Sequence, residues 1–523
     1  MRHPISLWGS PPLMRQLSKS KIIAFRQCPK RLWLEIHRPD LREDSSATQA
    51  AFQVGYEVGD VARKLYDPLG KGTVIDVASE GFSGAFEHTA QLIADTRSPI
   101  FEAGFSIRGA LAFADVLLPD TVDGNPAWRM VEVKSSTRIK NYHHDDIAVQ
   151  AFIARSAGVN LASVSLAHID SSWTYPGGGD YVGLLAEENF TEETLARAEE
   201  VAQWLDGAQE VAARTAEPDV ATGPQCSDPF DCGFCNYCNR DKVWPEYPLS
   251  SLPGFRQKRK DLCKEQGIED LRNVPDDLLT RQQQMVKEHT VAQTVYFDAE
   301  GAKAALAPHG FPALFLDFET TSMAVPQWKG TRPYEKIPFQ FSLHTLSEDG
   351  SVQNTAFLDL SGQDPSASFA KSLVQACGNT GPVFVFNAGF EKKVIADAAR
   401  RFPEFAEALE DLRSRIVDLL PIARSFHYHP SQHGSWSIKA VLPAVCPDLN
   451  YGDLDGVQDG GTAMNVFREA IHPQTTSERK QEIERDLLAY CRLDTFAMVR
   501  LWQVFSGRQD WLIQDNQHEG GCA

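Results

Sequence analysis

Apolar positions recur at helical spacing in some stretches of the chain and alternate with polar positions in others. In the first half, helical spacing covers residues 18–36, 50–66, 145–159 and 191–215. Strand-like patterns cover residues 109–120, 126–136 and 164–170, with a turn signal at 121–126. The order helix, strand, strand, helix, strand favours helices packed on a sheet, so we expect an α/β domain here.

The second half repeats this kind of pattern after a polar interval. Residues 246–305 are polar and broken by Pro and Gly, which predicts a small helical connector. Strands are then expected at 312–319, 339–347 and 381–388, and helices at 390–402 and 478–505. The predicted organisation is therefore a domain at 17–245, a connector at 246–305, a second α/β domain at 306–508 and a polar tail at 509–523.

Composition and charge narrow the class of protein. The chain has 523 residues, 42% of them apolar, and a net charge of −19, which argues against a surface that binds nucleic acid everywhere. Basic residues gather locally in residues 1–42 and 256–260, and such patches suit a groove. The sequence contains no run of about 18 apolar residues, so we expect no transmembrane helix and no membrane partner. Residues 1–16 lack the apolar segment of a signal peptide, so we expect a cytoplasmic protein.

Cysteines form the densest motif in the chain. Cys226, Cys232, Cys235 and Cys238 lie close together, and Cys28 precedes them by a whole domain. Thiolates at such spacing bind zinc or an iron–sulfur cluster, whereas disulfides are not expected without export. The spacing favours Cys28, Cys226, Cys232 and Cys238 as ligands, with Cys235 as the alternative. A zinc site built from the four local cysteines is the competing interpretation.

Between these cysteines lies a possible catalytic set. Asp115 is near the end of one predicted strand, and Glu132 and Lys134 are two residues apart on the next. Residues two apart on a strand share a face, so Glu132 and Lys134 project together. Asp115 and Glu132 then suit a Mg²⁺ or Mn²⁺ ion, and Lys134 suits the positioning of an attacking water.

These motifs in this order resemble the PD-(D/E)XK nucleases, in particular the RecB-like exonucleases that include CRISPR-associated members. The resemblance covers residues 17–245 and implies a restriction-endonuclease-like fold, a [4Fe–4S] cluster on four cysteines and a role for Gln150 on the following helix. The chain departs from the family at two positions. Gly59 stands where the family often has a histidine metal ligand, and Ala154 stands where it has a tyrosine.

The second domain carries a separate acidic set. Asp317 and Glu319 share a face of a predicted strand, Glu391 opens a helix, and Tyr490 and Asp494 are four apart on the closing helix. The four carboxylates suit two cations about 3.5–4 Å apart, which would activate water for phosphodiester hydrolysis. Tyr490 is then placed to orient that water.

This set resembles the DnaQ-like, or DEDD, 3′–5′ exonucleases of the tyrosine subclass, which have a ribonuclease H-like fold. The resemblance covers about residues 310–508. Glu391 replaces the family's aspartate, and Asp418 lies where the family often has a further acidic residue. The pairing of both domains is similar to a bacterial family with this two-domain architecture.

The sequence therefore predicts a metal-dependent nuclease with two catalytic centres and an iron–sulfur cluster, acting on DNA and preferably on single-stranded ends. Two alternatives remain at this point. In one, the RecB-like domain only binds nucleic acid and the DnaQ-like domain alone cuts. In the other, the chain is a zinc-structured scaffold without catalysis.

Overall fold

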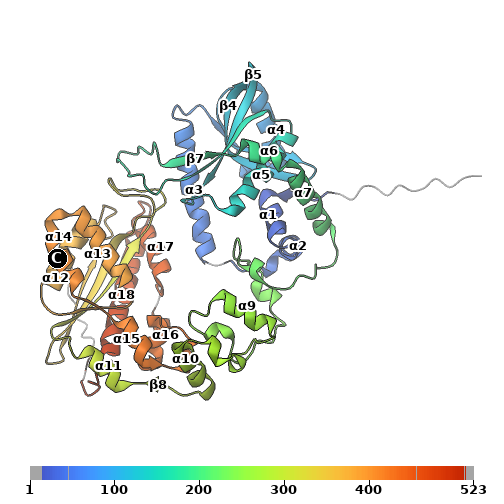
Figure 1. Cartoon of the computed structure of the whole chain (residues 1–523). Coiled ribbons are helices and arrows are strands. Elements are labelled where there is room, and N and C mark those ends of the chain that lie inside the picture. The colour runs from blue at the N-terminus through green and yellow to red at the C-terminus, as the bar shows by residue number, and fades with distance from the viewer. Residues whose placement is uncertain (1–13, 45, 455, 512, 514–523) are drawn as a thin grey trace, which may run out of the picture. The chain divides into compact units, whose positions relative to one another are not determined.

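The computed structural model describes residues 14–44, 46–454, 456–511 and 513. The described chain divides into two compact units, each with its own sheet and helices (Figure 1). The first unit runs to Lys242 and also takes the segment Met323–Tyr334, and the second takes Val243–Ser322 and the chain from Glu335 onward. The predicted α/β class is confirmed. Most of the predicted tail at 509–523 lies outside the described residues, as do residues 1–13.

The first unit is built on one sheet, in the order β2-β3-β4-β5-β6-β7 with β1 beside β4. Its strands in the described residues are β1 (Leu17–Ser18), β2 (Thr73–Val74), β3 (Ile100–Ile107), β4 (Ala110–Val122), β5 (Asn125–Lys134), β6 (Leu161–Ile169) and β7 (Leu185–Asn189). Its helices there are α1 (Lys19–Gln27), α2 (Pro29–His37), α3 (Ser46–Tyr66), α4 (Val77–Asp95), α5 (Asn141–Ser156), α6 (Thr191–Ala196), α7 (Ala198–Ala213) and α8 (Cys235–Cys238), with short 3₁₀ turns at Pro39–Leu41 and Pro224–Cys226.

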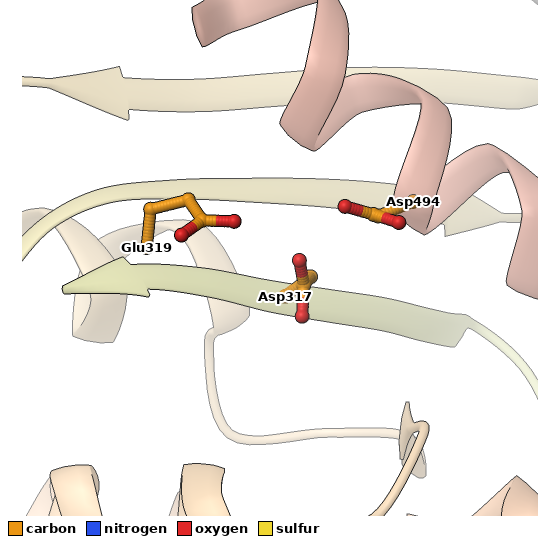
Figure 2. Close-up of side chains that lie close together, drawn as sticks. All are labelled: Asp317, Glu319 and Asp494. Carbon is orange, nitrogen blue, oxygen red and sulfur yellow. The ribbon is translucent and has the colours of Figure 1, made fainter. Parts of the chain in front are cut away.

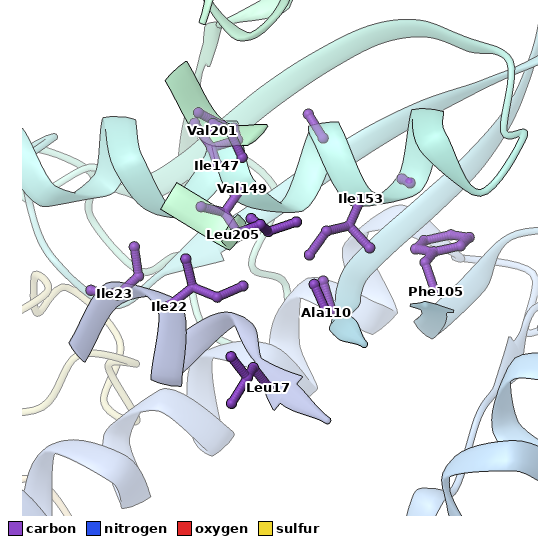
Figure 3. Packing of buried hydrophobic residues seen from close by; sticks show 14 of the residues in the cluster. Leu17, Ile22, Ile23, Phe105, Ala110, Ile147, Val149, Ile153, Val201 and Leu205 are labelled. Carbon is purple, nitrogen blue, oxygen red and sulfur yellow. The ribbon is translucent and has the colours of Figure 1, made fainter. Parts of the chain in front are cut away.

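Helices cover both faces of this sheet. On one face the core joins α1, α5 and α7 to the sheet, with side chains such as Ile22, Ile153 and Leu205 packed together (Figure 3). On the other face Val131 packs with Val116 of the sheet and with Tyr66 of α3. Burial of this apolar surface is the main favourable contribution to folding of the unit.

The N-terminal helical pattern differs from its prediction. Residues 18–36 form two helices instead of one, because Cys28 has an extended backbone and caps both α1 and α2. Pro29 explains the break, since a proline disfavours the helical conformation of the residue before it and suits the first position of the next helix. Cys28 is therefore held at a corner between two helices.

The second unit contains a sheet in the order β11-β10-β9-β12-β13 and a small ribbon of β14 and β8. Its strands in the described residues are β8 (Tyr296–Phe297), β9 (Ala313–Thr321), β10 (Ile337–Leu346), β11 (Val352–Leu358), β12 (Val383–Val385), β13 (Ile416–Asp418) and β14 (His427–Tyr428). Its helices there are α9 (Gln257–Glu265), α10 (Arg281–Ala292), α11 (Ala299–Leu306), α12 (Ser366–Cys377), α13 (Gly389–Arg401), α14 (Ala406–Ser414), α15 (Leu419–Phe426), α16 (Ile438–Val445), α17 (Gly460–Ala470) and α18 (Ser477–Phe505). Short 3₁₀ turns lie at Leu249–Ser251, Leu271–Asn273, Asp276–Leu278, Pro403–Phe405, Pro430–Gln432 and Tyr451–Asp453.

The central strand β9 separates two layers of helices. Its even-numbered side chains Leu314, Leu316 and Phe318 pack in a cluster with α12, α13 and α14. Its odd-numbered side chains point to the other face, where the ring of Phe315 lies 6.2 Å from that of Trp502 in α18. Among the described residues, every helix is too short or too polar to cross a membrane.

Candidate functional site

Three acidic side chains converge in the second unit. Asp317 and Glu319 project from β9 and Asp494 from α18, and all three carboxylates point toward one another (Figure 2). Each offers an oxygen within 4.8 Å of the others. Among the described residues, no other group of three or more acidic, histidine or cysteine side chains has ligand atoms within 4.8 Å of one another. The expected convergence of these three residues is thus present.

Local structure explains how α18 reaches this position. The buried Thr495 hydroxyl lies 2.7 Å from Ser342 Oγ and 2.8 Å from His344 Nδ1, both on β10. Gln340, also on β10, donates a 2.7 Å hydrogen bond to the carbonyl of Leu487 in α18. These buried polar contacts fix the helix against the sheet, so the residue before Thr495 faces β9.

The three carboxylates repel one another in a buried setting. Burial and the nearby Asp494 raise the pKa of Glu319 to about 8. Burial raises the pKa of Asp494 to about 6, although a hydrogen bond from Tyr451 opposes the shift. Burial, Asp494 and Glu319 raise the pKa of Asp317 well above its usual value. A bound divalent cation would relieve this repulsion, so the three carboxylates could hold a metal ion.

Glu391 and Tyr490 lie beside the triad. Glu391 is in the first turn of α13, and its buried Oε2 has no hydrogen-bond partner. Burial raises the pKa of Glu391 to about 7, and its charge contributes to the raised pKa of Asp317. Tyr490 is buried, and the hydrogen bond from its phenol to Asp494 opposes the raised pKa of that carboxyl. The predicted residues are therefore close together, with Glu391 outside the tightest group.

Asp418 binds backbone N–H groups next to the acidic residues. Its carboxylate accepts hydrogen bonds from the backbone N–H groups of Asn387 and Ala388, at 2.9 and 3.0 Å, and from that of Leu420 at 3.0 Å. The turn before α13 is thereby fixed, and Glu391 follows directly on that helix. Asp418 thus positions the acidic set through the backbone.

Two residues near the triad escaped the sequence analysis. The hydroxyl of Tyr451 donates a 2.5 Å hydrogen bond to Asp494 Oδ1. Lys439 Nζ lies 5.3 Å and 5.2 Å from the ring centres of Tyr451 and Tyr490, and its charge opposes the raised pKa of Glu319. A lone lysine in the apolar helix α16 (Ile438–Val445) and a lone tyrosine in a polar stretch carry no sequence signal, since only the fold brings them to the acids.

The start of α17 also approaches the triad. A Cβ atom built on Gly460, its first residue, would lie 3.5 Å from Glu319 Oε2. The helix N-terminus carries partial positive charge, which suits a nearby carboxylate or a phosphate. Glu319 is thus placed between a helix end and the other two acids.

The donors suit a hard divalent cation. Three carboxylates with raised pKa values supply oxygen ligands, which Mg²⁺ and Mn²⁺ prefer over sulfur or nitrogen. The unpartnered Oε2 of Glu391 offers one more oxygen nearby. The residues present therefore fit the metal ions predicted for this centre.

The first unit has a second acidic set with a different character. Glu132 lies on β5 and Asp115 on β4. Strands β3 and β4 pair on both sides of Asp115, but Asp115 itself is not paired with Glu102, the residue opposite it on β3. Glu102 has a φ of 55°, a conformation that a non-glycine residue adopts rarely, so this is a local irregularity of the strand. Asp115 Oδ2 accepts a 2.6 Å hydrogen bond from the backbone N–H of Val133.

Two lysines pair with the carboxylates here. Lys134 Nζ lies 2.7 Å from Glu132 Oε1 and contacts Asp146 of α5. Lys19, the first residue of α1, donates hydrogen bonds to Glu132 Oε1 at 2.6 Å and to Gln150 Oε1 at 2.6 Å. Of these residues, Lys19 and Asp146 were missed by the sequence analysis, whereas Glu132, Lys134 and Gln150 lie together as their motifs suggested.

Charges in this set balance more closely than in the triad. Burial would lower the pKa of Lys19 and of Lys134, but Asp146 and Glu132 outweigh it and raise both. Burial and Glu132 raise the pKa of Asp115 to about 8. Glu132 Oε2 is buried and has no hydrogen-bond partner. The set is thus partly neutralised by its own lysines, with one carboxylate oxygen free for a ligand.

The five cysteines of the sequence motif line one cavity of the first unit. Cys28, Cys226, Cys232, Cys235 and Cys238 surround it together with Lys30, Arg31 and the apolar Leu34 and Phe234. All five are free thiols. Gln27, the last residue of α1, donates hydrogen bonds to the carbonyls of Gln225 and Phe230 at 2.7 and 2.6 Å. The loop that carries the later cysteines is thereby tied to the helix that presents Cys28.

The distances between the cysteine sulfurs distinguish the geometry of a single zinc ion from that of an iron–sulfur cluster. Tetrahedral zinc at about 2.3 Å from each sulfur needs sulfurs about 3.8 Å apart. Within the described residues, no three cysteine sulfurs lie within 4.8 Å of one another. A polynuclear cluster accepts wider spacing, because each thiolate binds a different iron. The five thiols therefore offer the donor type that an iron–sulfur cluster requires.

Comparison with known proteins adds one similarity. Residues 314–437 match a family model described as a domain of unknown function (DUF2779). The match includes Asp317, Glu319 and Glu391 and stops before Tyr490 and Asp494. None of the curated proteins matches the chain significantly.

Proposed function

We propose that the chain is a metal-dependent nuclease that hydrolyses phosphodiester bonds of DNA, with single-stranded ends as the preferred substrate. The observation that carries the proposal is the convergence of Asp317, Glu319 and Asp494 within 4.8 Å in a buried, mutually repelling group. Such a group is costly to fold without a cation, so its presence favours a metal-dependent function over a structural one.

The likeness to DnaQ-like exonucleases of the tyrosine subclass supports this reading of the second unit. In that reading the sheet of β9 to β13 has a ribonuclease H-like fold, and Tyr490 and Asp494 form the last motif. Glu391 takes the place of an aspartate. The first unit is then a restriction-endonuclease-like domain of the RecB-like kind, built around Asp115, Glu132 and Lys134.

Each residue near the triad has a distinct task in this proposal. Two divalent ions, when bound, would supply Lewis-acid chemistry that activates water and stabilises the leaving oxygen. Tyr490 and Tyr451 hold the carboxylate of Asp494 in one orientation through their hydroxyl groups. Lys439 brings positive charge next to Glu319 and Asp494, where a phosphate of the substrate would add negative charge.

A second candidate concerns the first unit alone. Gly59 lies in α3, and a Cβ atom built there would meet no described atom within 4 Å, so this position supplies no metal ligand in place of the histidine of the RecB-like family. Lys19 also pairs with Glu132 and Asp146. These observations favour a first domain that binds nucleic acid and cuts weakly or not at all, while the second domain cuts.

We also propose that the cysteine cavity holds a [4Fe–4S] cluster with a structural task. Cys28 comes from the N-terminal helices and the other thiols from the end of the unit, so a cluster would join the two. Anaerobic purification followed by visible absorbance and analysis of iron, sulfide and zinc tests this. A colourless protein that contains zinc would refute the cluster.

The proposed activity is tested by cleavage of an end-labelled single strand in Mn²⁺. Wild type is compared with Asp317→Ala, with Asp115→Ala and with a control, Glu348→Ala, on an exposed turn after β10. We expect Asp317→Ala to lose most of the cleavage and the control to retain it. Unchanged cleavage in both Asp317→Ala and Asp115→Ala would contradict the proposal.

A further inference from the structure

Lys19 is a charged member of the first centre that comes from outside its strands. Its ammonium lies 2.6 Å from Glu132 Oε1, 3.2 Å from Asp146 Oδ2 and 2.6 Å from Gln150 Oε1. These acceptors belong to β5 and α5, so Lys19 joins three elements at one point. Its side chain is only 19% exposed.

This position is unfavourable for a lysine unless it has a specific task. Lys19 is the first residue of α1, and the first turn of that helix contains no acidic residue. A cation at a helix N-terminus opposes the positive end of the helix dipole, and partial burial of an ammonium adds a desolvation cost. Helix stability therefore does not explain Lys19, whereas its contacts with Glu132 and Asp146 do.

The charge balance shows what Lys19 changes. Fully ionised, Asp115, Glu132 and Asp146 carry three negative charges against two positive charges on Lys19 and Lys134, so the set has at most one net negative charge. The next carboxylate, Glu102, lies 3.7 Å from Arg63. With Lys19 in place a divalent ion is attracted by at most one net charge, and a second ion beside it would meet strong repulsion.

Two buried polar atoms of the set have no partner and point to a ligand. Glu132 is 2% exposed, and its Oε2 is unpartnered while Oε1 accepts from both lysines. Gln150 is fully buried, and its Nε2 is unpartnered. Because an ammonium only donates, Lys19 fixes the oxygen of Gln150 toward itself and leaves the amide N–H groups for an acceptor such as a phosphate oxygen.

We propose that Lys19 is a fixed cation of the first centre, which limits that centre to one divalent ion bound between Asp115 and the second oxygen of Glu132. Lys19 is a positioning residue: it holds Glu132 and Gln150 and lowers the affinity of the centre for metal. The inference rests on the proposed function, because it takes the first domain to be metal-dependent.

Binding of Mn²⁺ alone tests this without any cleavage assay. The full chain carries Asp317→Asn and Asp494→Asn, so that the second centre no longer competes. This double variant, which retains Lys19, is the parent. The affinity and stoichiometry of Mn²⁺ binding are measured by calorimetry and by electron paramagnetic resonance in the parent and after adding Lys19→Met or Lys19→Arg. Lys21→Met, two residues along the same helix, is the control.

We expect one Mn²⁺ in the parent and in Lys19→Arg. In Lys19→Met the loss of a nearby positive charge raises affinity about tenfold or more, or admits a second ion. Mn²⁺ should also raise the melting temperature of Lys19→Met more than that of the parent, because the unpaired Glu132 and Asp146 destabilise the metal-free state. Lys19→Gln is measured alongside, so that misfolding of the methionine variant alone does not decide the outcome.

Three results would overturn the inference. Equal affinity in the parent, Lys19→Met and Lys19→Gln would show that the charge has no effect on metal. A tenfold change in Lys19→Arg as well would assign the effect to packing. No Mn²⁺ in any form would favour the nucleic-acid-binding first domain, and cleavage by the second centre would still stand or fall on Asp317→Ala.

Discussion

Removal of one charge from the acidic triad should stabilise the metal-free protein. Glu319→Gln keeps the shape of the side chain and deletes its negative charge. Glu319 lies within 4.8 Å of both Asp317 and Asp494, measured between carboxylate oxygens. At an effective dielectric constant of about 20, two unit charges at that distance repel by about 3.5 kcal/mol.

Partial protonation reduces this gain, since the pKa of Glu319 is already raised to about 8. We therefore expect Glu319→Gln to raise the free energy of unfolding by roughly 2–3 kcal/mol in EDTA at about pH 8, where the wild-type side chain is partly ionised. For a unit of this size, that change corresponds to a melting temperature roughly 5–10 °C higher.

Thermal unfolding by circular dichroism, with and without Mn²⁺, measures this effect. Hydrogen exchange of peptides from β9 and α18 assigns it to the second unit. Mn²⁺ should make the wild type melt at a higher temperature than Glu319→Gln, because the wild type gains metal-binding energy that the variant has lost. Glu348→Gln is the matched control, since Glu348 is exposed.

A variant that is no more stable than Glu348→Gln in EDTA would contradict the repulsion. Equal stabilisation of wild type and Glu319→Gln by Mn²⁺ would contradict metal binding at the triad.

Three further predictions concern separate parts of the molecule. Tyr451→Phe removes the hydrogen bond to Asp494, so cleavage should fall about tenfold with little change in melting temperature, measured by initial rates. Cys28→Ser should lose iron and visible absorbance, whereas Cys263→Ala, away from the cavity, should retain both by metal analysis. Burial lowers the pKa of His427 to about 4 from a usual 6.5. The unfolded state therefore binds more protons between these values, and stability should fall by about 3 kcal/mol as pH drops through that window. Urea unfolding of His427→Phe should show a weaker pH dependence, and an unchanged dependence would contradict the shift.

Local pattern was sufficient for the parts of the second centre that lie on regular elements. Asp317 and Glu319 share a face of β9 because strand side chains alternate, and Tyr490 and Asp494 share a face of α18 because they are four residues apart. Their meeting across the sheet follows from helix-on-sheet packing, which the order of elements already suggested.

The supporting residues could not be found in this way. Lys439 and Tyr451 lie on α16 and on a short 3₁₀ turn, and only tertiary packing brings them to Asp494. Lys19 reaches Glu132 across 113 positions of the chain. Its placement at a helix start was the one local clue, because a cation there is unfavourable.

The break of the N-terminal helix at Cys28 was foreseeable from Pro29, since a proline disfavours a helical residue before it. The gathering of Cys28 with the later cysteines was expected from the family resemblance rather than from any local pattern.

The central claim is that the triad of the second unit cuts nucleic acid. The most direct test is cleavage of an end-labelled single strand by the full chain with Asp115→Ala, so that only the second centre is intact. The account predicts Mn²⁺-dependent shortening of the strand that disappears when Asp317→Ala is added. Cleavage that persists in the double variant, or no cleavage by Asp115→Ala at any Mn²⁺ concentration, would contradict it.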